Sequence, residues 1–200
     1  MRLKVCFYFS CLILFLGSCN KTAPTKKTCP DFPLATANVL QSDERALFDL
    51  VLNTYYTGIS WRMAQLAGKE ITLDLASGII RESGANVATE IIENYVLNNH
   101  IPTQLPDEFR FPLITYAEMD CIYSIDPELA FWDNFHTKYP NYDGFISFTR
   151  PGLNINRTKA VLIYGVGFGT LNEGAEYIVN FEKINGVWTI LQRFDSPMIN

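Results

Sequence analysis

The chain has 200 residues, of which 48% are hydrophobic and 18% are charged, and its formal net charge at pH 7 is −5. The apolar content excludes intrinsic disorder for most of the chain, and the length suits one domain with a sizeable core. The mildly acidic charge is not accompanied by a basic run, which argues against nucleic acid as a partner.

The N-terminal residues have the three parts of a secretory signal. Arg2 and Lys4 form a basic start, residues 5–16 form an apolar run, and the tetrapeptide Leu16–Cys19 closes it. The run is too short to span a bilayer comfortably, since spanning takes about 20 apolar residues. The alternatives are a true transmembrane N-terminus, or an ordinary cleaved signal in which Cys19 is not lipidated.

The tetrapeptide resembles the lipobox of bacterial lipoprotein signals, in which a branched apolar residue and two small residues precede a cysteine. The resemblance implies a signal peptide over residues 1–18, cleavage before Cys19, and a diacylglycerol with a further acyl chain such as palmitate on Cys19. Two or more acyl chains make membrane binding stable. Because no acidic pair follows the cysteine, we expect a cell-envelope protein anchored by lipid in the outer membrane and facing the periplasm.

The remaining chain divides into a tether and a body. Residues 19–33 begin with a polar stretch that has no large apolar side chain, so we expect a flexible lipoprotein tether there. Residues 34–200 are expected to form a single α+β domain, which is one ordinary domain by length.

Two cysteines remain for the folded body. Cys6 and Cys11 leave with the signal and Cys19 carries lipid, so Cys29 and Cys121 are left. An exported protein permits a disulfide between them, while the apolar surroundings of Cys121 are equally typical of a small buried residue. The sequence leaves both interpretations open, and no pair of cysteines has the spacing of a metal site.

Helix signals dominate the first half of the body. Ser42–Arg45 predicts a helix start, with Ser42 as cap and two acids at the positive end, and apolar residues then recur every three or four positions until about Gly58. Asn86–Asn98 predicts a second helix. Between them, Glu70–Leu75 alternates strictly between polar and apolar residues, which predicts a half-buried strand.

Prolines separate this part from the next. Three of them in residues 101–112 predict an irregular connection, and Leu113–Tyr123 is then expected as a strand. Asp126–Glu128 predicts a helix start, with Asp126 as cap and a proline in the first turn, and Pro140 ends this helix.

The C-terminal part predicts a four-stranded antiparallel meander. The strands are expected at residues 144–149, 159–166, 175–183 and 187–194. Asn185-Gly186 predicts a two-residue hairpin turn between the last two strands. Because helices come first and consecutive strands later, we expect an α+β fold in which N-terminal helices pack on a C-terminal antiparallel β-meander with a curved, cone-like sheet.

The C-terminal block also resembles a recurrent pattern, which is carried by Phe148–Asn154, Thr158–Tyr164, Gly174–Val179 and Lys183–Ile190. These segments are similar to a Thr-Arg-x-Gly-x-Asn turn, an apolar strand, a glycine-rich bend and a Lys-x-x-Gly-x-Trp hairpin found in uncharacterised bacterial exported proteins. The cysteines that the pattern has in the bend are missing here, so no disulfide is expected there. The resemblance implies a family without assigned chemistry, and it looks like cystatin-like and nuclear-transport-factor-like cone folds; it supplies no catalytic residue.

Histidines and glycines in this sequence have structural interpretations. His100 follows a helix end, where a positive charge is favoured, and His136 shares a helix face with Trp132 and Tyr139. We interpret both as packed or surface residues rather than as a catalytic base or metal ligand. The run Gly165–Gly169 lacks the spacing and the following helix of a phosphate-binding loop, so glycines at a strand end are the better interpretation.

Acidic, aromatic and basic groups are more open candidates. Glu173 with Glu176, and Asp120 with Asp126, could serve acid–base chemistry on a glycan if they met in a cleft, although solvated loop acids are the simpler interpretation. Aromatic residues are dense between positions 131 and 148 and are expected in the core, with sugar or peptide stacking as the alternative. The basic cluster, interpreted as a solvated turn, consists of Arg150, Arg157 and Lys159.

These observations favour a non-enzymatic, membrane-anchored envelope lipoprotein whose domain binds an unknown protein or glycan. No catalytic residue, metal site or cofactor is assigned. The alternatives are a carboxylate-dependent hydrolase of envelope glycans or peptides, and an inhibitor or immunity-type protein that blocks a partner enzyme.

Overall fold

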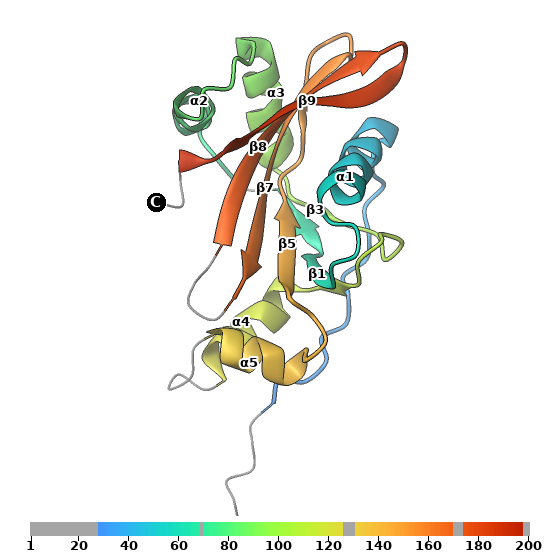
Figure 1. The fold of residues 1–200 in the computed structure, drawn as a ribbon, viewed down its shortest axis with the longest axis vertical. Helices are drawn as coiled ribbons and strands as arrows, with labels where there is room; N and C mark the ends of the chain where they lie inside the picture. Colours follow the sequence, from blue (N-terminus) through green and yellow to red (C-terminus); the bar gives the residue numbers. More distant parts are fainter. Residues whose placement is uncertain (1–27, 69, 126–130, 170–173, 198–200) are drawn as a thin grey trace, which may run out of the picture.

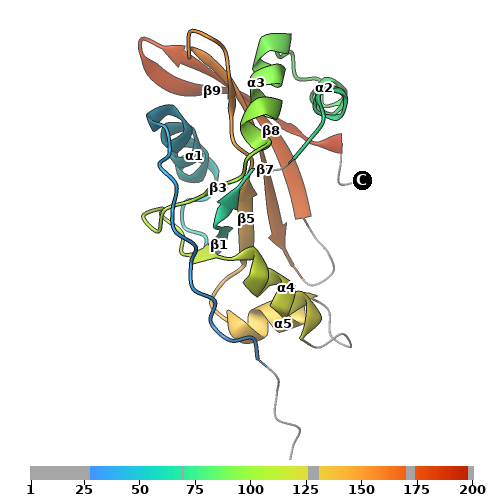
Figure 2. The same ribbon diagram turned by 180° about the vertical axis from the view of Figure 1, so that it is seen from behind.

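The computed structural model describes residues 28–68, 70–125, 131–169 and 174–197. A twisted sheet forms its centre, with helices on both faces and a further helix pair at one end (Figures 1 and 2). The helices of the described residues are α1 (Ser42–Tyr55), α2 (Leu73–Glu82), α3 (Thr89–Asn99), α4 (Tyr116–Ser124) and α5 (Phe131–Lys138). The strands are β1 (Trp61–Ala64), β2 (Leu66–Ala67), β3 (Thr103–Gln104), β4 (Leu113–Ile114), β5 (Gly144–Phe148), β6 (Gly152–Leu153), β7 (Lys159–Phe168), β8 (Gly174–Ile184) and β9 (Val187–Asp195).

The main sheet has the order β4-β1-β5-β7-β8-β9, and β6 pairs with β7 outside this path. Strands β5, β7, β8 and β9 form the antiparallel meander that the sequence predicts. Asn185 and Gly186 both have positive φ, which is the type I′ geometry expected of a two-residue hairpin. On the other side of β5, β1 pairs in parallel with both β5 and β4, and β2 and β3 form a separate antiparallel pair.

The α+β class is confirmed, but the arrangement differs from the expected one. Helices alternate with strands instead of preceding them, and two early strands, β1 and β4, join the sheet beside the meander. The sheet does not close into a cone, because β4 and β9 remain as its two edges. The early strands are two to four residues long, which is too short to show a periodic pattern in the sequence.

The strand predicted at Glu70–Leu75 is wrong, because its second half belongs to α2 and its first half forms no strand. Thr72 caps this helix by accepting a hydrogen bond from the Leu75 amide at 3.3 Å. Leu73 and Leu75 are exposed at 39% and 49%, while the apolar residues that follow at helical spacing are buried. The alternation therefore runs across the start of a helix, and Thr72, a residue type favoured as a helix cap, marks that start.

The strand predicted at Leu113–Tyr123 is wrong over most of its length. Only the first two residues form β4, after which Thr115 caps α4 by accepting from the Glu118 amide at 3.1 Å. The helix start predicted at Asp126–Glu128 lies outside the described residues. Within them, α5 begins at Phe131 and buries two aromatic side chains of the predicted face, Trp132 and Phe135.

Both faces of the sheet are covered by packing that follows the strand period of two. Along β7, Leu162 and Tyr164 pack on the α1 side, whereas Val161 and Ile163 pack under α2 and α3. A third cluster joins α4 and α5 to the end of the sheet. Helix α3 lies directly on β6, because a Cβ atom at Gly152 would be 2.3 Å from the Ile91 carbonyl oxygen.

Two carboxylates attach the N-terminus of α1 to the meander. Asp43 accepts hydrogen bonds from Lys183 Nζ at 2.7 Å and Trp188 Nε1 at 2.8 Å. It also accepts one from Arg157 Nε at 2.7 Å. Glu44 is 1% exposed, accepts from Arg150 Nε at 2.8 Å, and closes a capping box with Gln41. The cap is therefore Gln41 and not Ser42 as predicted, and both acids lie at the positive end of the helix.

The Asp43 attachment predicts a pH-dependent contribution to stability. Burial alone would raise the pKa of Asp43 above 3.8, but its hydrogen bonds outweigh burial and lower this pKa to about 2. The ionised carboxylate therefore stabilises the fold above about pH 4, and this contribution is lost as the pH falls through 2. We expect Asp43→Asn to reduce the free energy of unfolding by about 1–2 kcal/mol at neutral pH, since solvent screens part of the interaction.

Urea unfolding of both proteins between neutral pH and pH 2 measures this difference, which should shrink as the pH falls. Asp49→Asn is the matched control, because Asp49 is 40% exposed and pairs only with Arg45 on the same helix. A deficit of equal size at every pH would contradict the prediction.

Candidate functional site

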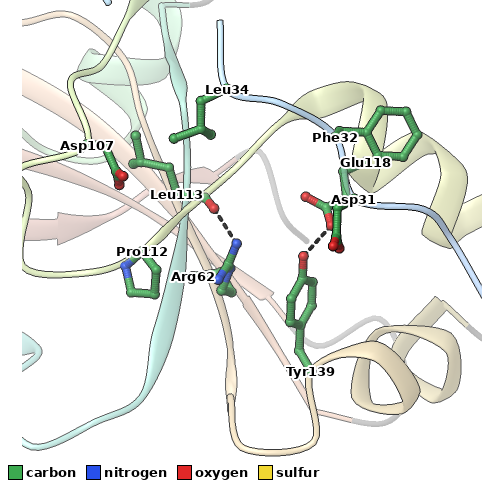
Figure 3. A pocket seen from close by; sticks show the side chains of 9 residues that line it. All are labelled: Asp31, Phe32, Leu34, Arg62, Asp107, Pro112, Leu113, Glu118 and Tyr139. Atoms are coloured by element: carbon green, nitrogen blue, oxygen red, sulfur yellow. Dashed lines mark hydrogen bonds between the residues drawn. The ribbon is translucent and has the colours of Figure 1, made fainter.

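A pocket of about 370 Å³ opens between the N-terminal segment, the loop that precedes β4, and the α4–α5 end of the sheet (Figure 3). Its polar lining consists of Asp31, Arg62, Asp107, Glu118 and Tyr139. These residues come from five separate parts of the chain, so the fold alone brings them together.

Arg62 lies deep in this pocket, and no acidic side chain of the described residues pairs with its charge. It projects from β1, where it is paired in register with Phe145 of β5. Its guanidinium packs over the Tyr139 ring at 4.5 Å from the centroid and lies 5.4 Å from that of Tyr142, which holds it by cation–π contact. One end donates a hydrogen bond to the Leu113 carbonyl oxygen, which Figure 3 shows.

The hydrogen bonding of Arg62 is incomplete. Its Nε is buried without a hydrogen-bond partner, and none of the ion pairs among the described residues includes Arg62. A guanidinium has five N–H donors, so this side chain retains donors for a further acceptor. An arginine of this kind is suited to a carboxylate or another planar anion.

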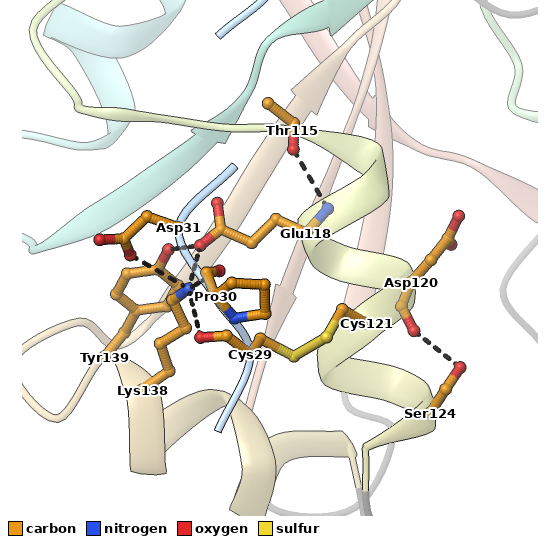
Figure 4. The surroundings of a disulfide bond; sticks show 10 residues. All are labelled: Cys29, Pro30, Asp31, Thr115, Glu118, Asp120, Cys121, Ser124, Lys138 and Tyr139. Carbon is orange, nitrogen blue, oxygen red and sulfur yellow. Dashed lines mark hydrogen bonds and ion pairs between the residues drawn. A yellow bond between two sulfur atoms is a disulfide. The ribbon is translucent and has the colours of Figure 1, made fainter. Parts of the chain in front are cut away.

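The wall opposite Arg62 is a saturated hydrogen-bond cluster (Figure 4). Glu118 is 4% exposed; it accepts a hydrogen bond from the Tyr139 hydroxyl and lies 2.7 Å from Lys138 Nζ. Lys138 also donates to the carbonyl oxygens of Cys29 at 3.1 Å and Pro30 at 2.6 Å. The Asp31 carboxylate lies 3.4 Å from the same ammonium group, so the lysine, with four acceptors around three protons, is satisfied.

The Tyr139 hydroxyl serves as a donor in this cluster. Burial raises the pKa of Tyr139, and its hydrogen bond to the Glu118 carboxylate raises it further. The phenol is therefore protonated throughout the physiological range and cannot act as a base there. Glu118 is correspondingly held in place by two donors.

The structure joins Cys29 and Cys121 in a disulfide across 92 residues of sequence, which settles the choice that the sequence left open. The Cα atoms are 6.0 Å apart, which is an ordinary distance for such a bond. Together with Lys138, the disulfide fixes the start of the described chain against α4 and α5 (Figure 4). Asp31 and Phe32, which line the pocket, follow directly after this attachment.

The other candidate residues do not gather in this pocket. His136 packs among aromatic rings at 6.1 Å from Trp132, and His100 caps the C-terminus of α3 near Glu70 at 3.9 Å. Glu176 lies on β8 and accepts a hydrogen bond from Ser196 at 2.8 Å. Asp120 lies on the exposed side of α4. Cys19, Glu173 and Asp126 lie outside the described residues.

The basic cluster has a structural role. Arg150 pairs with Glu44 and Arg157 with Asp43, while Lys159 lies 3.7 Å from Glu182 on the neighbouring strand. The interpretation as a solvated turn is wrong for Arg150, because its partner Glu44 is buried. These pairings connect the meander to α1.

Sequence reasoning missed Arg62, Glu118, Lys138 and Tyr139. The available signal for Arg62 was a lone charge in the apolar segment Trp61–Ala64, but the strand that contains it was not recognised. Glu118 and Lys138 belong to two helices that meet only in the fold, so no spacing along the chain relates them.

No protein-family model, curated protein or solved structure matches this chain. The described part of the chain contains no helix with the length and apolar character of a membrane span. Within the same residues, no group of three or more metal-ligating side chains is placed to hold an ion.

The disulfide predicts a large effect of reduction on stability. It closes a loop of 92 residues, so removing it restores freedom to the unfolded chain. We expect the double variant Cys29→Ser/Cys121→Ser to lose about 2–4 kcal/mol of unfolding free energy. Urea unfolding with and without dithiothreitol measures this loss, and the double variant is its own control because reductant should no longer affect it. Equal stability of the oxidised and reduced wild-type protein would contradict the prediction.

Proposed function

We propose that this protein is a lipid-anchored component of the bacterial cell envelope whose domain binds a small zwitterionic ligand at Arg62. The ligand class is an amino acid or the end of a short peptide. The observation that carries the binding function is the buried, incompletely bonded guanidinium of Arg62. The membrane attachment is supported by the lipobox-like Leu16–Cys19, which lies outside the described residues.

The charges around the pocket favour a zwitterion over a simple anion. Three acidic groups lie in or beside it, against two basic ones, so the surroundings carry one negative charge in excess. A carboxylate would bind Arg62, while the exposed Asp31 and Asp107 at the rim would attract an amine. An anion without an amine would meet the acidic rim unpaired.

The groups that could perform acid–base chemistry are already engaged. Glu118 is held by Lys138 and Tyr139, and the raised pKa of Tyr139 keeps its hydroxyl protonated. A fixed cluster of this kind preorganises a binding site, because its side chains are already ordered before the ligand binds and association does not have to order them. These features support binding rather than turnover as the function.

Loss of the Arg62 guanidinium should weaken ligand binding strongly. We expect isothermal titration of the detergent-solubilised full chain with a panel of amino acids and dipeptides to identify binders, and Arg62→Gln to weaken them by about a hundredfold, as for a lost charge-assisted pair. N-acetylated and C-amidated forms of each binder separate the two charges. Amidation removes the ligand carboxylate and should lower affinity as Arg62→Gln does. Acetylation removes the charged amine and should lower affinity as Asp107→Asn does.

Two controls accompany this titration. Arg110→Gln removes an exposed arginine that stacks on Phe111, and it should leave affinity unchanged. Arg62→Lys keeps the charge but loses the planar fork, and it should bind with intermediate affinity. Binding that survives Arg62→Gln in a folded protein, or a panel without any binder, would reject the proposed function.

Membrane attachment should depend on Cys19. We expect Cys19→Ser to move the protein from the membrane to the soluble fraction or to leave the signal uncleaved, because the thioether cannot form. Cell fractionation and incorporation of a labelled fatty acid measure this outcome. Ser18→Ala keeps a small residue before the cysteine and should behave as wild type. A Cys19→Ser protein that is fully processed and membrane-bound would refute the anchor.

A further inference from the structure

Gly165 occupies the middle of β7, in the centre of the sheet, without a structural requirement for glycine. Its φ is not in the left-handed region. A Cβ atom there would meet only Ser147 Oγ at 3.2 Å and the Ala175 carbonyl oxygen at 4.0 Å. By contrast, a Cβ atom at Gly144 would lie 2.1 Å from a backbone oxygen. Glycine weakens a strand interior, and it often marks a site where a ligand or another backbone approaches the strand closely.

The register of the sheet makes Gly165 the floor of a trough. Gly165 is paired with Ser147 of β5 on one side and with Glu176 of β8 on the other. All three positions lie on the face opposite α1, since their neighbours along each strand pack toward that helix. The missing side chain therefore leaves a gap between Ser147 and Glu176, whose Cα atoms are about 10 Å apart at the usual strand spacing.

This trough is part of a pocket that is partly open to solvent. The cavity has a volume of about 310 Å³, and Tyr116 at the start of α4 contributes to its lining. In Figure 1 this part of β7 and β8 lies between α2 and α3 on one side and α4 and α5 on the other, so the two helix pairs flank it. Its size is at the small end of cavities that bind small molecules, which limits the occupant to about one ring.

The polar groups of the trough are hydroxyls and one carboxylate. Ser147 and Glu176 lie at opposite sides of Gly165, and the Tyr116 side chain is 43% exposed. Ser196 donates to Glu176 Oε1 at 2.8 Å, which orients the carboxylate. Among the described residues that line the cavity, Glu176 is the charged one. A hydroxyl on one side of the backbone floor and a carboxylate on the other suit an occupant with hydroxyls on both edges, whereas a simple cation needs only the carboxylate.

We propose that the trough over Gly165 is a second binding site, which takes a single neutral sugar ring of a glycan. The ring would lie on the peptide backbone of β7. Its hydroxyls would donate to Glu176 and exchange hydrogen bonds with Ser147, and its apolar face would meet Tyr116. Among the described residues, this site shares no lining residue with the Arg62 pocket, so we expect the two sites to bind independently.

Saturation-transfer NMR on the detergent-solubilised full chain tests the proposal with glucose, N-acetylglucosamine and propylamine as probes. We expect at least one sugar to bind and Gly165→Ala to weaken it by about tenfold or more, because the added methyl group fills the floor. The melting temperature of this variant should stay level or rise, since alanine is better tolerated in strands than glycine. Glu176→Gln should also weaken sugar binding.

Two control variants distinguish binding at this site from a general effect of a glycine substitution and from binding in the Arg62 pocket. Gly78→Ala replaces a glycine of α2 that has no atom within 4 Å of the new Cβ, and it should keep full sugar affinity. Arg62→Gln should keep it as well, which distinguishes this site from the Arg62 pocket. Binding of propylamine alone, absence of binding by both sugars, or unchanged affinity in Gly165→Ala would each overturn the proposal.

Discussion

The carboxylates of Asp43 and Glu44 attach helix α1 to the C-terminal meander. They lie at the start of α1 and accept hydrogen bonds from side chains 106 to 145 residues further along the chain. Because these bonds dock α1 on one face of the sheet, Phe48 and Val51 can bury against the meander. The opposite face is then left to the other helices and to the trough over Gly165.

This attachment also accounts for the C-terminal pattern seen in the sequence. Its arginine, Arg150, bonds to Glu44, and the lysine and tryptophan of its hairpin, Lys183 and Trp188, bond to Asp43. Its glycine, Gly152, leaves room for the backbone of α3. The pattern residues therefore specify how helices dock on the meander, and a pattern of this kind carries no chemistry of its own.

The meander was predictable because β7, β8 and β9 are nine to eleven residues long and an Asn-Gly turn joins β8 to β9. Strand β1 was not predictable, since it is four residues long and pairs in parallel with partner strands more than 40 residues away in the sequence. The Arg62 pocket depends on that strand, so it was missed with it. Cys29 and Cys121 were visible as a pair, but only packing brings α4 to the N-terminal segment.

The Cys29–Cys121 bond determines how tension would pass through the domain. A pull on the N-terminal end reaches Cys29 and can cross to α4 through the disulfide, which is a covalent path that bypasses the loop between the two cysteines, 92 residues apart in sequence. That loop contains α1, β1 and the arginine of the pocket. Load on the N-terminal end would thus enter the domain at α4, which carries Glu118 of the pocket wall, whereas Arg62 lies within the bypassed loop.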